Sequence, residues 1–320
     1  MMAKEKPRFK RFVGAKPEER VDKFASTHST SKVPRKSKAV MIGRQNKFRT
    51  AVQVIFTALT NGYAAGFAKG QIFRGASKQT CVPGLNCYSC PGAVGSCPIG
   101  SLQAVIGKQN HRFSFYVIGT LMIFGSLMGR FICGWLCPFG LVQDLLFKVP
   151  FPKKIRDFNG DKLLRYLKYL ILIIFVIGMP ILVLGPYGAS VPWFCKLVCP
   201  SGSLTAGIPL VASNRDLQNL IGVLFSWKMI LLSVIIFSSI IIYRPFCKFL
   251  CPLGAIYGIF NKFSLYQYEI DESRCVKCGG CHRACHMGVK IYENPTSAEC
   301  IRCGKCIEVC PKDAISTKKF

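Results

Sequence analysis

Eight cysteines near the C-terminus follow one spacing pattern twice, and this repeat restricts the fold more than any other feature of the chain. Residues 275–285 read C-x2-C-x2-C-x3-C, and residues 300–310 repeat that spacing before a proline. In a doubled run of this kind, three close thiolates hold one [4Fe–4S] cluster and the fourth reaches the other cluster. The spacing predicts one cluster on Cys275, Cys278, Cys281 and Cys310, and a second on Cys300, Cys303, Cys306 and Cys285. Residues 263–320 are therefore expected to form an α+β ferredoxin domain of the bacterial 2[4Fe–4S] type.

Haem and zinc are the other cofactors that short cysteine spacings suggest. The segment from Cys278 to His282 matches the C-x-x-C-H signature of c-type haem attachment, but the ferredoxin pattern already requires both of its cysteines. A zinc site needs four ligands and not a doubled run of eight. The pattern therefore favours iron–sulfur clusters over both.

The rest of the chain is apolar enough to lie in a membrane. Half of its 320 residues are hydrophobic, and the chain is too long and apolar for its 18 cysteines to indicate a small disulfide scaffold. Crossing a bilayer takes about 20 largely apolar residues. Four segments qualify, namely 51–68, 113–131, 167–184 and 225–243. We expect an α-helical integral membrane protein with four transmembrane helices over residues 49–262. Lys228, beside Trp227 in the last segment, is expected to snorkel to the interface.

The distribution of Lys and Arg predicts the orientation. The chain has 43 such residues against 15 Asp and Glu, a net charge of +28. Of the 43, 35 lie in residues 1–50, 130–168 and 244–320, on one side of the four segments. The positive-inside rule then places both termini in the cytoplasm of a prokaryotic cell. Residues 1–48 are expected to be a disordered basic tail against anionic lipid or a partner protein, and nucleic-acid binding is not expected.

Two further cysteine pairs recur in one string on the cytoplasmic side. The string R-x2-C-x3-C-P-x-G begins at Arg130 and again at Arg244. Cysteines four residues apart lie on one side of a helical turn, so two such pairs supply the four thiolates of a third cluster. The predicted ligands are Cys133, Cys137, Cys247 and Cys251. The two arginines either offset the negative charge of that cluster or snorkel to the interface.

A C-P-x-G ending also recurs on the outer side, at Cys97 and Cys199. Cys199 has a cysteine four residues earlier, whereas Ala93 stands at the matching position before Cys97. The chain then reads as two parallel repeats, each with a span, an outer cysteine group, a span and an inner group. A fourth cluster is expected at the outer face. Its candidate ligands are Cys87, Cys90, Cys97, Cys195 and Cys199. Cys81 and one more cysteine are then spare or form a disulfide; alternatively, all the outer cysteines form disulfides.

The C-x3-C-P strings at membrane faces, followed by a double-cluster module, resemble the polyferredoxin-like membrane proteins of the NapH and NosR type. The resemblance covers about residues 45–315. It rests on the inner set and the eight C-terminal cysteines. It implies respiratory electron transfer, with quinol oxidation in the NapH case. The chain departs from the pattern in lacking an S-G-A-T-like string for covalent flavin and in its additional outer cysteines.

The leading interpretation is a membrane-bound iron–sulfur protein that relays electrons. Its partners would be a cytoplasmic or quinone-pool donor and a redox protein such as a flavoprotein or respiratory reductase, so that it would act as a quinol dehydrogenase-like subunit. The alternatives are a maturation factor that reduces a metal for a partner enzyme, and a redox sensor that acts through the basic tail. Deletion of residues 1–45 separates the last of these, because a relay keeps electron transfer whereas a sensor loses its output.

Overall fold

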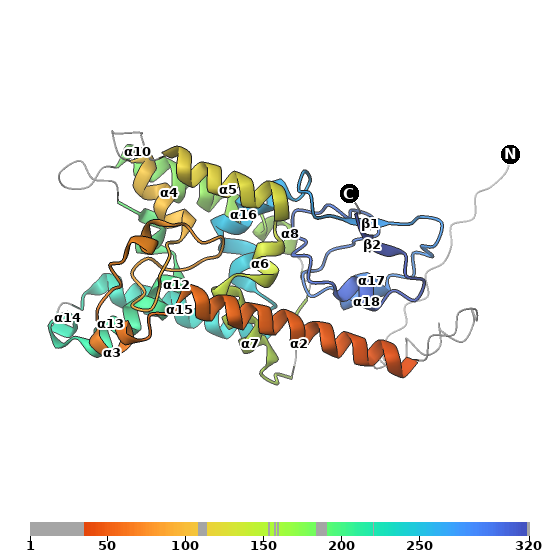
Figure 1. Cartoon of the computed structure of the whole chain (residues 1–320), viewed down its shortest axis with the longest axis horizontal. Helices are drawn as coiled ribbons and strands as arrows, with labels where there is room; N and C mark the ends of the chain where they lie inside the picture. Colours follow the sequence, from red (N-terminus) through yellow and green to blue (C-terminus); the bar gives the residue numbers. More distant parts are fainter. Residues whose placement is uncertain are drawn as a thin grey trace. The chain divides into compact units, whose positions relative to one another are not determined.

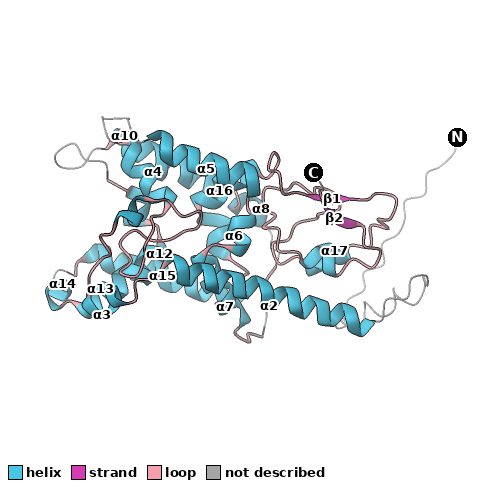
Figure 2. Ribbon diagram, viewed as in Figure 1, coloured by secondary structure: helices cyan, strands magenta, loops and turns pink. Residues whose placement is uncertain are grey.

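The computed structural model shows a mainly helical chain with a small two-stranded sheet near the C-terminus (Figure 2). It describes residues 35–107, 114–152, 154–156, 158, 160–183, 191–219 and 221–318. Residues 41–320 form one compact unit. The expected basic tail lies outside the described residues as far as position 34.

The first long helix, α2 (Arg35–Thr60), begins well before the predicted first span (Figure 1). Residues 35–48, assigned to the disordered tail, are helical, and they contain no proline that would prevent this. The helix ends inside the predicted span of 51–68, and a short helix, α3 (Ala65–Lys69), follows. At the break, the side chain of Asn61 donates to the carbonyl of Thr57 at 3.1 Å, a local bond of the kind that competes with helix continuation.

The other three predicted spans also coincide with helices. They are α5 (Ser114–Met128), the run α8 (Asp161–Leu164), α9 (Leu167–Ile171), η3 (Leu172–Gly178) and α10 (Met179–Leu182), and α15 (Val223–Ile241). The predicted ends Phe113 and Leu184 lie outside the described residues. Within the described ranges, two helices are long and apolar enough to cross a membrane, Asp161–Leu182 and Val223–Ile241, while the apolar part of α5 is shorter.

All four of these helical regions expose large apolar side chains. On α2 and α5 they include Val54, Ile55, Leu59, Phe115, Met122 and Ile123. On the third and fourth they include Ile173, Ile181, Leu182, Val223, Ile230, Val234 and Phe237. Monomeric soluble proteins rarely expose apolar patches of such extent.

Four helices begin with a proline that directly follows a cysteine. They are α4 (Pro98–Ile106), α7 (Pro138–Lys148), α12 (Pro200–Gly202) and α16 (Pro252–Phe260). Proline suits the first helical position, because its fixed φ matches the helix and its missing N–H would have no helical partner there. Each preceding cysteine has extended backbone angles, for example φ −77° and ψ 118° at Cys137. The C-P dipeptides of the four C-P-x-G strings are therefore helix starts.

Shorter helical segments connect these helices. They are η1 (Ala76–Gln79), α6 (Phe131–Trp135), α11 (Trp193–Leu197), η5 (Ser203–Gly207), α13 (Ile208–Ser213), α14 (Arg215–Asn219) and η6 (Phe246–Leu250). Within residues 41–320, α3, α13 and α14 lie at the end of the long helices opposite to the two-stranded sheet (Figure 1).

The C-terminal module has the expected α+β composition. Strands β1 (Tyr268–Ile270) and β2 (Ile315–Thr317) pair antiparallel, and the short helices α17 (Gly280–Ala284) and α18 (Lys305–Glu308) accompany them. The two cysteine runs share unusual backbone angles, because φ is +49° at Lys277 and +51° at the matching Arg302. Residues with side chains rarely adopt positive φ, so this shared feature indicates that both runs wind in the same way.

Candidate iron–sulfur sites

Each predicted C-terminal set of cysteines surrounds one cavity. Cys275, Cys278, Cys281 and Cys310 line the first, and Cys285, Cys300, Cys303 and Cys306 line the second. In each set the fourth cysteine comes from the other run, and these two cysteines accept equivalent backbone hydrogen bonds. The N–H of Val289 lies 3.4 Å from Cys285 Sγ, and the N–H of Ala314 lies 3.3 Å from Cys310 Sγ. Such N–H donors favour sulfur in its charged form and adjust cluster potentials.

The four cysteines predicted for the inner site lie together in the main core. Cys133, Cys137, Cys247 and Cys251 are each 5–6% exposed. Burial raises the pKa of Cys251, and the nearby thiols of Cys247 and Cys133 raise it further. The second cysteine of each pair ends a π-type turn, in which the hydrogen bond spans five residues. The N–H of Cys137 donates to the carbonyl of Ile132 at 3.1 Å, and the N–H of Cys251 donates to that of Phe246 at 2.9 Å. The four cysteines are therefore buried neighbours in the core.

Two buried arginines cross between the repeats at this site. Arg130 donates to the carbonyl of Cys247 at 2.9 Å, and Arg244 donates to the carbonyl of Cys133. A Cβ on Gly254 would lie 3.1 Å from the Arg130 guanidinium, and one on Gly140 would lie 3.3 Å from that of Arg244. The arginine of each R-x2-C-x3-C-P-x-G string therefore occupies the space that the final glycine of the other string leaves free. Both arginines are 0% exposed, which contradicts snorkelling to the interface.

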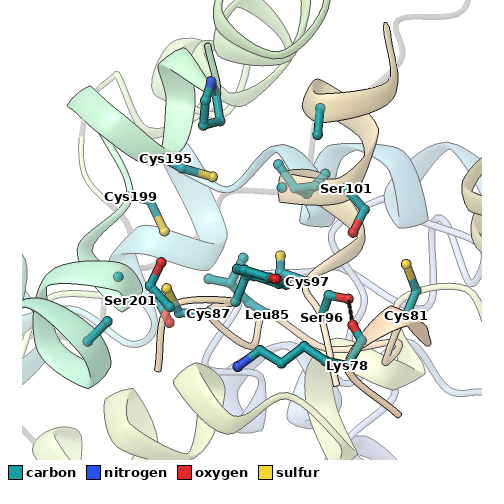
Figure 3. A pocket seen from close by; sticks show the side chains of 18 of the residues that line it. Lys78, Cys81, Leu85, Cys87, Ser96, Cys97, Ser101, Cys195, Cys199 and Ser201 are labelled. Carbon is teal, nitrogen blue, oxygen red and sulfur yellow. Dashed lines mark hydrogen bonds between the residues drawn. The ribbon is translucent and has the colours of Figure 1, made fainter. Parts of the chain in front are cut away.

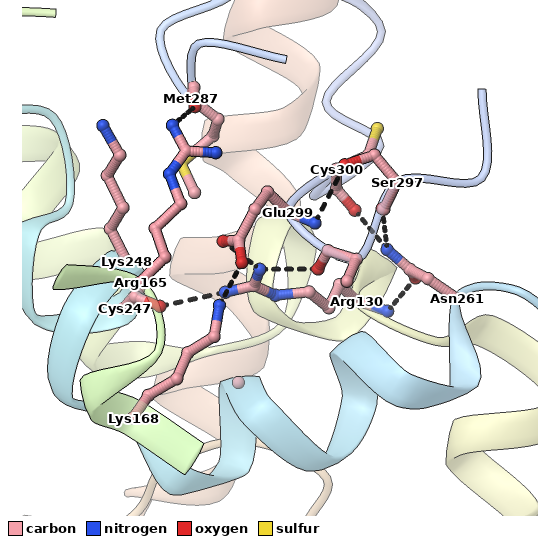
Figure 4. A network of polar contacts seen from close by, with 12 residues as sticks. Arg130, Arg165, Lys168, Cys247, Lys248, Asn261, Met287, Ser297, Glu299 and Cys300 are labelled. Atoms are coloured by element: carbon pink, nitrogen blue, oxygen red, sulfur yellow. Dashed lines mark hydrogen bonds and ion pairs between the residues drawn. The ribbon is translucent and has the colours of Figure 1, made fainter. Parts of the chain in front are cut away.

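Each arginine belongs to a buried group of two cations around one carboxylate. Arg130 and Lys168 both contact Glu299, the former at 2.7 Å (Figure 4). Arg244 and Arg49 contact Asp144 at 2.6 and 3.1 Å. Buried charges require such pairing. Each triad keeps one net positive charge beside the thiols of the inner set.

The two triads obtain their carboxylates differently. Asp144 lies on α7 of the first repeat, and the position 114 residues later in the second repeat is Gly258. A Cβ on Gly258 would lie 3.0 Å from the carbonyl of Ala298, next to Glu299. Burial alone would raise the pKa of Glu299, but Arg130 and Lys168 lower it to about 2. The C-terminal module therefore supplies the acid that the second repeat lacks.

The segment between the first inner cysteines packs directly on the C-terminal module. Gly134 has no room for a side chain, because the carbonyl of Ile301 occupies that space. The indole N–H of Trp135 donates to the carbonyl of Arg302 at 3.1 Å. Arg302 in turn donates to the carbonyl of Met128 at 2.8 Å. The loop from Cys133 to Cys137 thus touches the loop from Cys300 to Cys303.

The outer cysteines are only partly brought together. Five of them, namely Cys81, Cys87, Cys97, Cys195 and Cys199, line one cavity of about 1480 Å³, and Cys81 lies on the side away from Cys195 and Cys199 (Figure 3). Cys90 does not line it, and its thiol lies 3.7 Å from the Asn61 carbonyl oxygen. All 18 cysteines are free thiols, so the structure does not support the disulfide considered for Cys81.

A cubane fits these cysteine sets better than a single ion does. Within the described parts of the chain, no three His, Cys, Asp or Glu side chains converge closely enough to hold one metal ion. A cubane binds each thiolate through a different iron, so its four sulfur ligands stand farther apart. The two C-terminal sets of four cysteines, each around a cavity, are consistent with that geometry.

Two family models described as 4Fe–4S binding domains match the chain. One matches residues 110–159, 169–214 and 223–265, which contain the three C-x3-C-P strings, and the other matches residues 297–316. An uncharacterized protein of Methanocaldococcus jannaschii is 35% identical over 228 residues, which are 69% of this chain and 85% of that protein.

Two relatives with descriptive names are ferredoxin-type proteins. The methylamine utilization ferredoxin-type protein MauN of Methylobacillus flagellatus is 26% identical over 53% of this chain and 53% of its own length. The ferredoxin-type protein NapH of Haemophilus influenzae is 27% identical over 52% of this chain and 50% of its own length. The chain belongs to the NapH/NosR-type polyferredoxin family. The resemblance inferred from the cysteine strings is thereby confirmed, and no solved structure matches this polyferredoxin.

Several polar residues at the inner site of this polyferredoxin were not predicted from the sequence. They are Arg49, Asp144, Lys168 and Glu299, together with Gln143, which donates to Cys247 Sγ at 3.1 Å. One signal was available: Asp144 is an isolated acid in the apolar segment of α7. The pKa of Asp144 would rise on burial, but Arg244 and Arg49 hold it below the ordinary value. An unneutralised acid there would be costly, so a cationic partner could have been inferred.

Proposed function

We propose that this polyferredoxin is a four-span protein of a prokaryotic cytoplasmic membrane that relays electrons between a redox protein at its C-terminal module and a partner at the membrane. The redox protein would be a flavoprotein or respiratory reductase, and the membrane partner would be the quinone pool. The observation that carries the proposal is the direct packing of Gly134 and Trp135 on Ile301 and Arg302. [4Fe–4S] clusters bound by the C-terminal and inner cysteines would supply one-electron transfer.

The membrane part of the proposal rests on surface chemistry. Exposed apolar side chains on all four long helical regions suit contact with lipid tails. Most Lys and Arg residues flank one side of these helices, which favours a cytoplasmic position for both termini and for the C-terminal module.

The chain's own residues hold and shield the inner site. Arg130 and Arg244 neutralise negative charge on the thiolates and fix the loops of the opposite repeat through the carbonyls of Cys247 and Cys133. The cysteines are almost wholly buried, which keeps water out. Low exposure also strengthens every electrostatic interaction within the site.

Iron content tests the proposal. Anaerobically purified protein should bind at least about 12 iron atoms per chain, four for each of three cubanes. Replacing Cys247 with serine should remove about four of them, together with one EPR signal. The signals of the two C-terminal clusters should persist in the same sample and serve as the control for folding. An iron content of about 8 that Cys247→Ser leaves unchanged would contradict the relay into the membrane.

The arginine triads should raise the reduction potential of the inner cluster. Replacing Arg244 with glutamine removes a buried positive charge that favours the reduced, more negative cluster, so its potential should become more negative. Arg244→Lys retains the charge and should stay near the wild-type value. EPR-monitored redox titration measures both, and the C-terminal clusters should not shift. Equal potentials for the Gln variant and the wild type would exclude charge tuning by Arg244.

A further inference from the structure

We infer that a fourth [4Fe–4S] cluster is bound at the opposite end of the helices by Cys87, Cys97, Cys195 and Cys199, and that Cys81 and Cys90 are not ligands. This inference rests on the proposed function and extends it. With this cluster, the relay would end at the outer face, where a one-electron redox protein would exchange single electrons with it.

The four cysteines face a common space, two from each repeat. Cys87 and Cys97 of the first repeat and Cys195 and Cys199 of the second line the same cavity (Figure 3). The set therefore has the two-plus-two origin of the inner set.

The C-P-x-G glycines face the opposite repeat at both ends of the molecule. At the inner site each glycine leaves room for the arginine of the other repeat. At the outer site, a Cβ on Gly202 would lie 3.5 Å from Cys87 Sγ, and one on Gly100 would lie 3.8 Å from Cys195 Sγ. Each glycine thus faces a sulfur atom of the opposite repeat.

The same glycines also supply donors to the thiols that precede them. The N–H of Gly100 forms a hydrogen bond with the thiol of Cys97, and the N–H of Gly202 forms one with the thiol of Cys199. The N–H of Gly254 lies 3.4 Å from Cys251 Sγ at the inner site. Hydrogen bonds of this kind stabilise a charged sulfur ligand, so the outer thiols are prepared in the same manner as the inner ones.

The other two outer cysteines are placed differently, because Cys90 lies outside the cavity and Cys81 lines it on the side away from Cys195 and Cys199 (Figure 3). Cys90 is 1% exposed, does not line the cavity, and lies beside Asn61. Its carbonyl accepts from Lys78 at 3.5 Å. The N–H of Cys81 donates to the Tyr116 hydroxyl at 3.4 Å. Cys87 therefore serves as the partner of Cys97, because Ala93 stands at the position four residues before it.

Two lysines provide positive charge at the outer set. Lys228 turns inward and donates to the carbonyl of Cys195 at 3.3 Å. Lys78 is 4% exposed and donates to the carbonyl of Ala93 at 3.0 Å. Within the described ranges neither forms an ion pair with a carboxylate. An ionisable residue in a membrane-spanning helix usually serves a function, and an anionic cluster would account for Lys228.

A buried tyrosine of α16 connects the inner and outer sets of cysteines. Helix α16 begins after Cys251, and its Tyr257 is 0% exposed. The Tyr257 hydroxyl donates to the carbonyl of Pro83 at 3.0 Å, in the loop that carries the outer cysteines of the first repeat. The two sites are thus parts of one packed core.

Cysteine-to-serine variants of the full-length, anaerobically purified protein test the inference. The wild type should contain about 16 iron atoms per chain, and Cys97→Ser or Cys195→Ser should each lose about four. Cys81→Ser and Cys90→Ser, in the same loop region, should retain all of them. A Lys228→Gln variant should keep its iron but show a more negative potential for one cluster only.

The outcomes separate this inference from the proposed function. If Cys97→Ser and Cys195→Ser lose no iron while Cys247→Ser does, the outer cluster is excluded and the inner relay stands. Loss of iron from Cys90→Ser or Cys81→Ser, or zinc in place of iron, would overturn the ligand set. Persisting EPR signals from the C-terminal clusters in each variant exclude unfolding as the cause of any loss.

Discussion

Replacing Glu299 with glutamine should destabilise the protein by about 3–5 kcal/mol, because it leaves Arg130 and Lys168 buried beside each other without a carboxylate. Both cations have side chains that are 0% exposed. The variant should unfold at a lower temperature in detergent and lose the EPR signal of the inner cluster first. The pKa of Glu299 falls from 4.5 to about 2 on folding. Its contribution to stability is therefore fully present above about pH 4.5 and is lost as the pH falls toward 2.

Glu293→Gln is the matched control for that prediction. Glu293 lies six residues earlier in the same module and pairs with Lys290, but the two side chains are 55% and 52% exposed. Exposed pairs contribute little, so this variant should stay within about 0.5 kcal/mol of the wild type. A similar loss of stability in both variants would show that burial of the Glu299 triad is not the cause.

Gly134→Ala should separate the C-terminal module from the inner site. The added methyl group would collide with the backbone carbonyl of Ile301, which cannot move aside as a flexible side chain could. Overpacking of this kind costs about 1–3 kcal/mol. We expect slower electron exchange between the C-terminal and inner clusters, measured by rapid mixing with a one-electron donor, and weaker magnetic coupling between them in EPR.

Gly119→Ala provides the control for this substitution. Gly119 lies within α5, and a Cβ there would meet nothing within 4 Å. Alanine at an unobstructed helical position is favourable by about 0.5–1 kcal/mol. This variant should match the wild type in electron exchange. If Gly134→Ala also matches it, the contact with Ile301 is not the route between the two sites.

Sequence reasoning reaches furthest where cysteines are close in the chain and their spacing repeats. The C-terminal runs and the string at Arg130 and Arg244 predict sets of cysteines that lie near one another in the structure, and their role as ligands stays a prediction. It could not decide between Cys87 and Cys90, because the irregular loop before Cys97 has no periodicity that fixes the direction of its side chains.

Polar contacts between residues far apart in the chain also could not be predicted from the sequence. Arg130 and Glu299 are 169 positions apart, and no local pattern connects an arginine after one helix with a glutamate between two cysteine runs. The first predicted span differs from the helix for another reason. Apolar composition marks only the C-terminal part of α2, whereas its helical extension back to Arg35 depends on polar residues with adequate helix propensity.

The crossing of Arg130 and Arg244 has an evolutionary consequence. Neither of the two repeats can complete the inner site alone, since each arginine binds a carbonyl of the other repeat. A half-length ancestor would have had to form a symmetric homodimer with an acid on each side. In this chain, Gly258 stands where the first repeat has Asp144, and Glu299 supplies the acid for the second repeat. A repeat that diverges from its partner in this way can keep its arginine only while the C-terminal module is present.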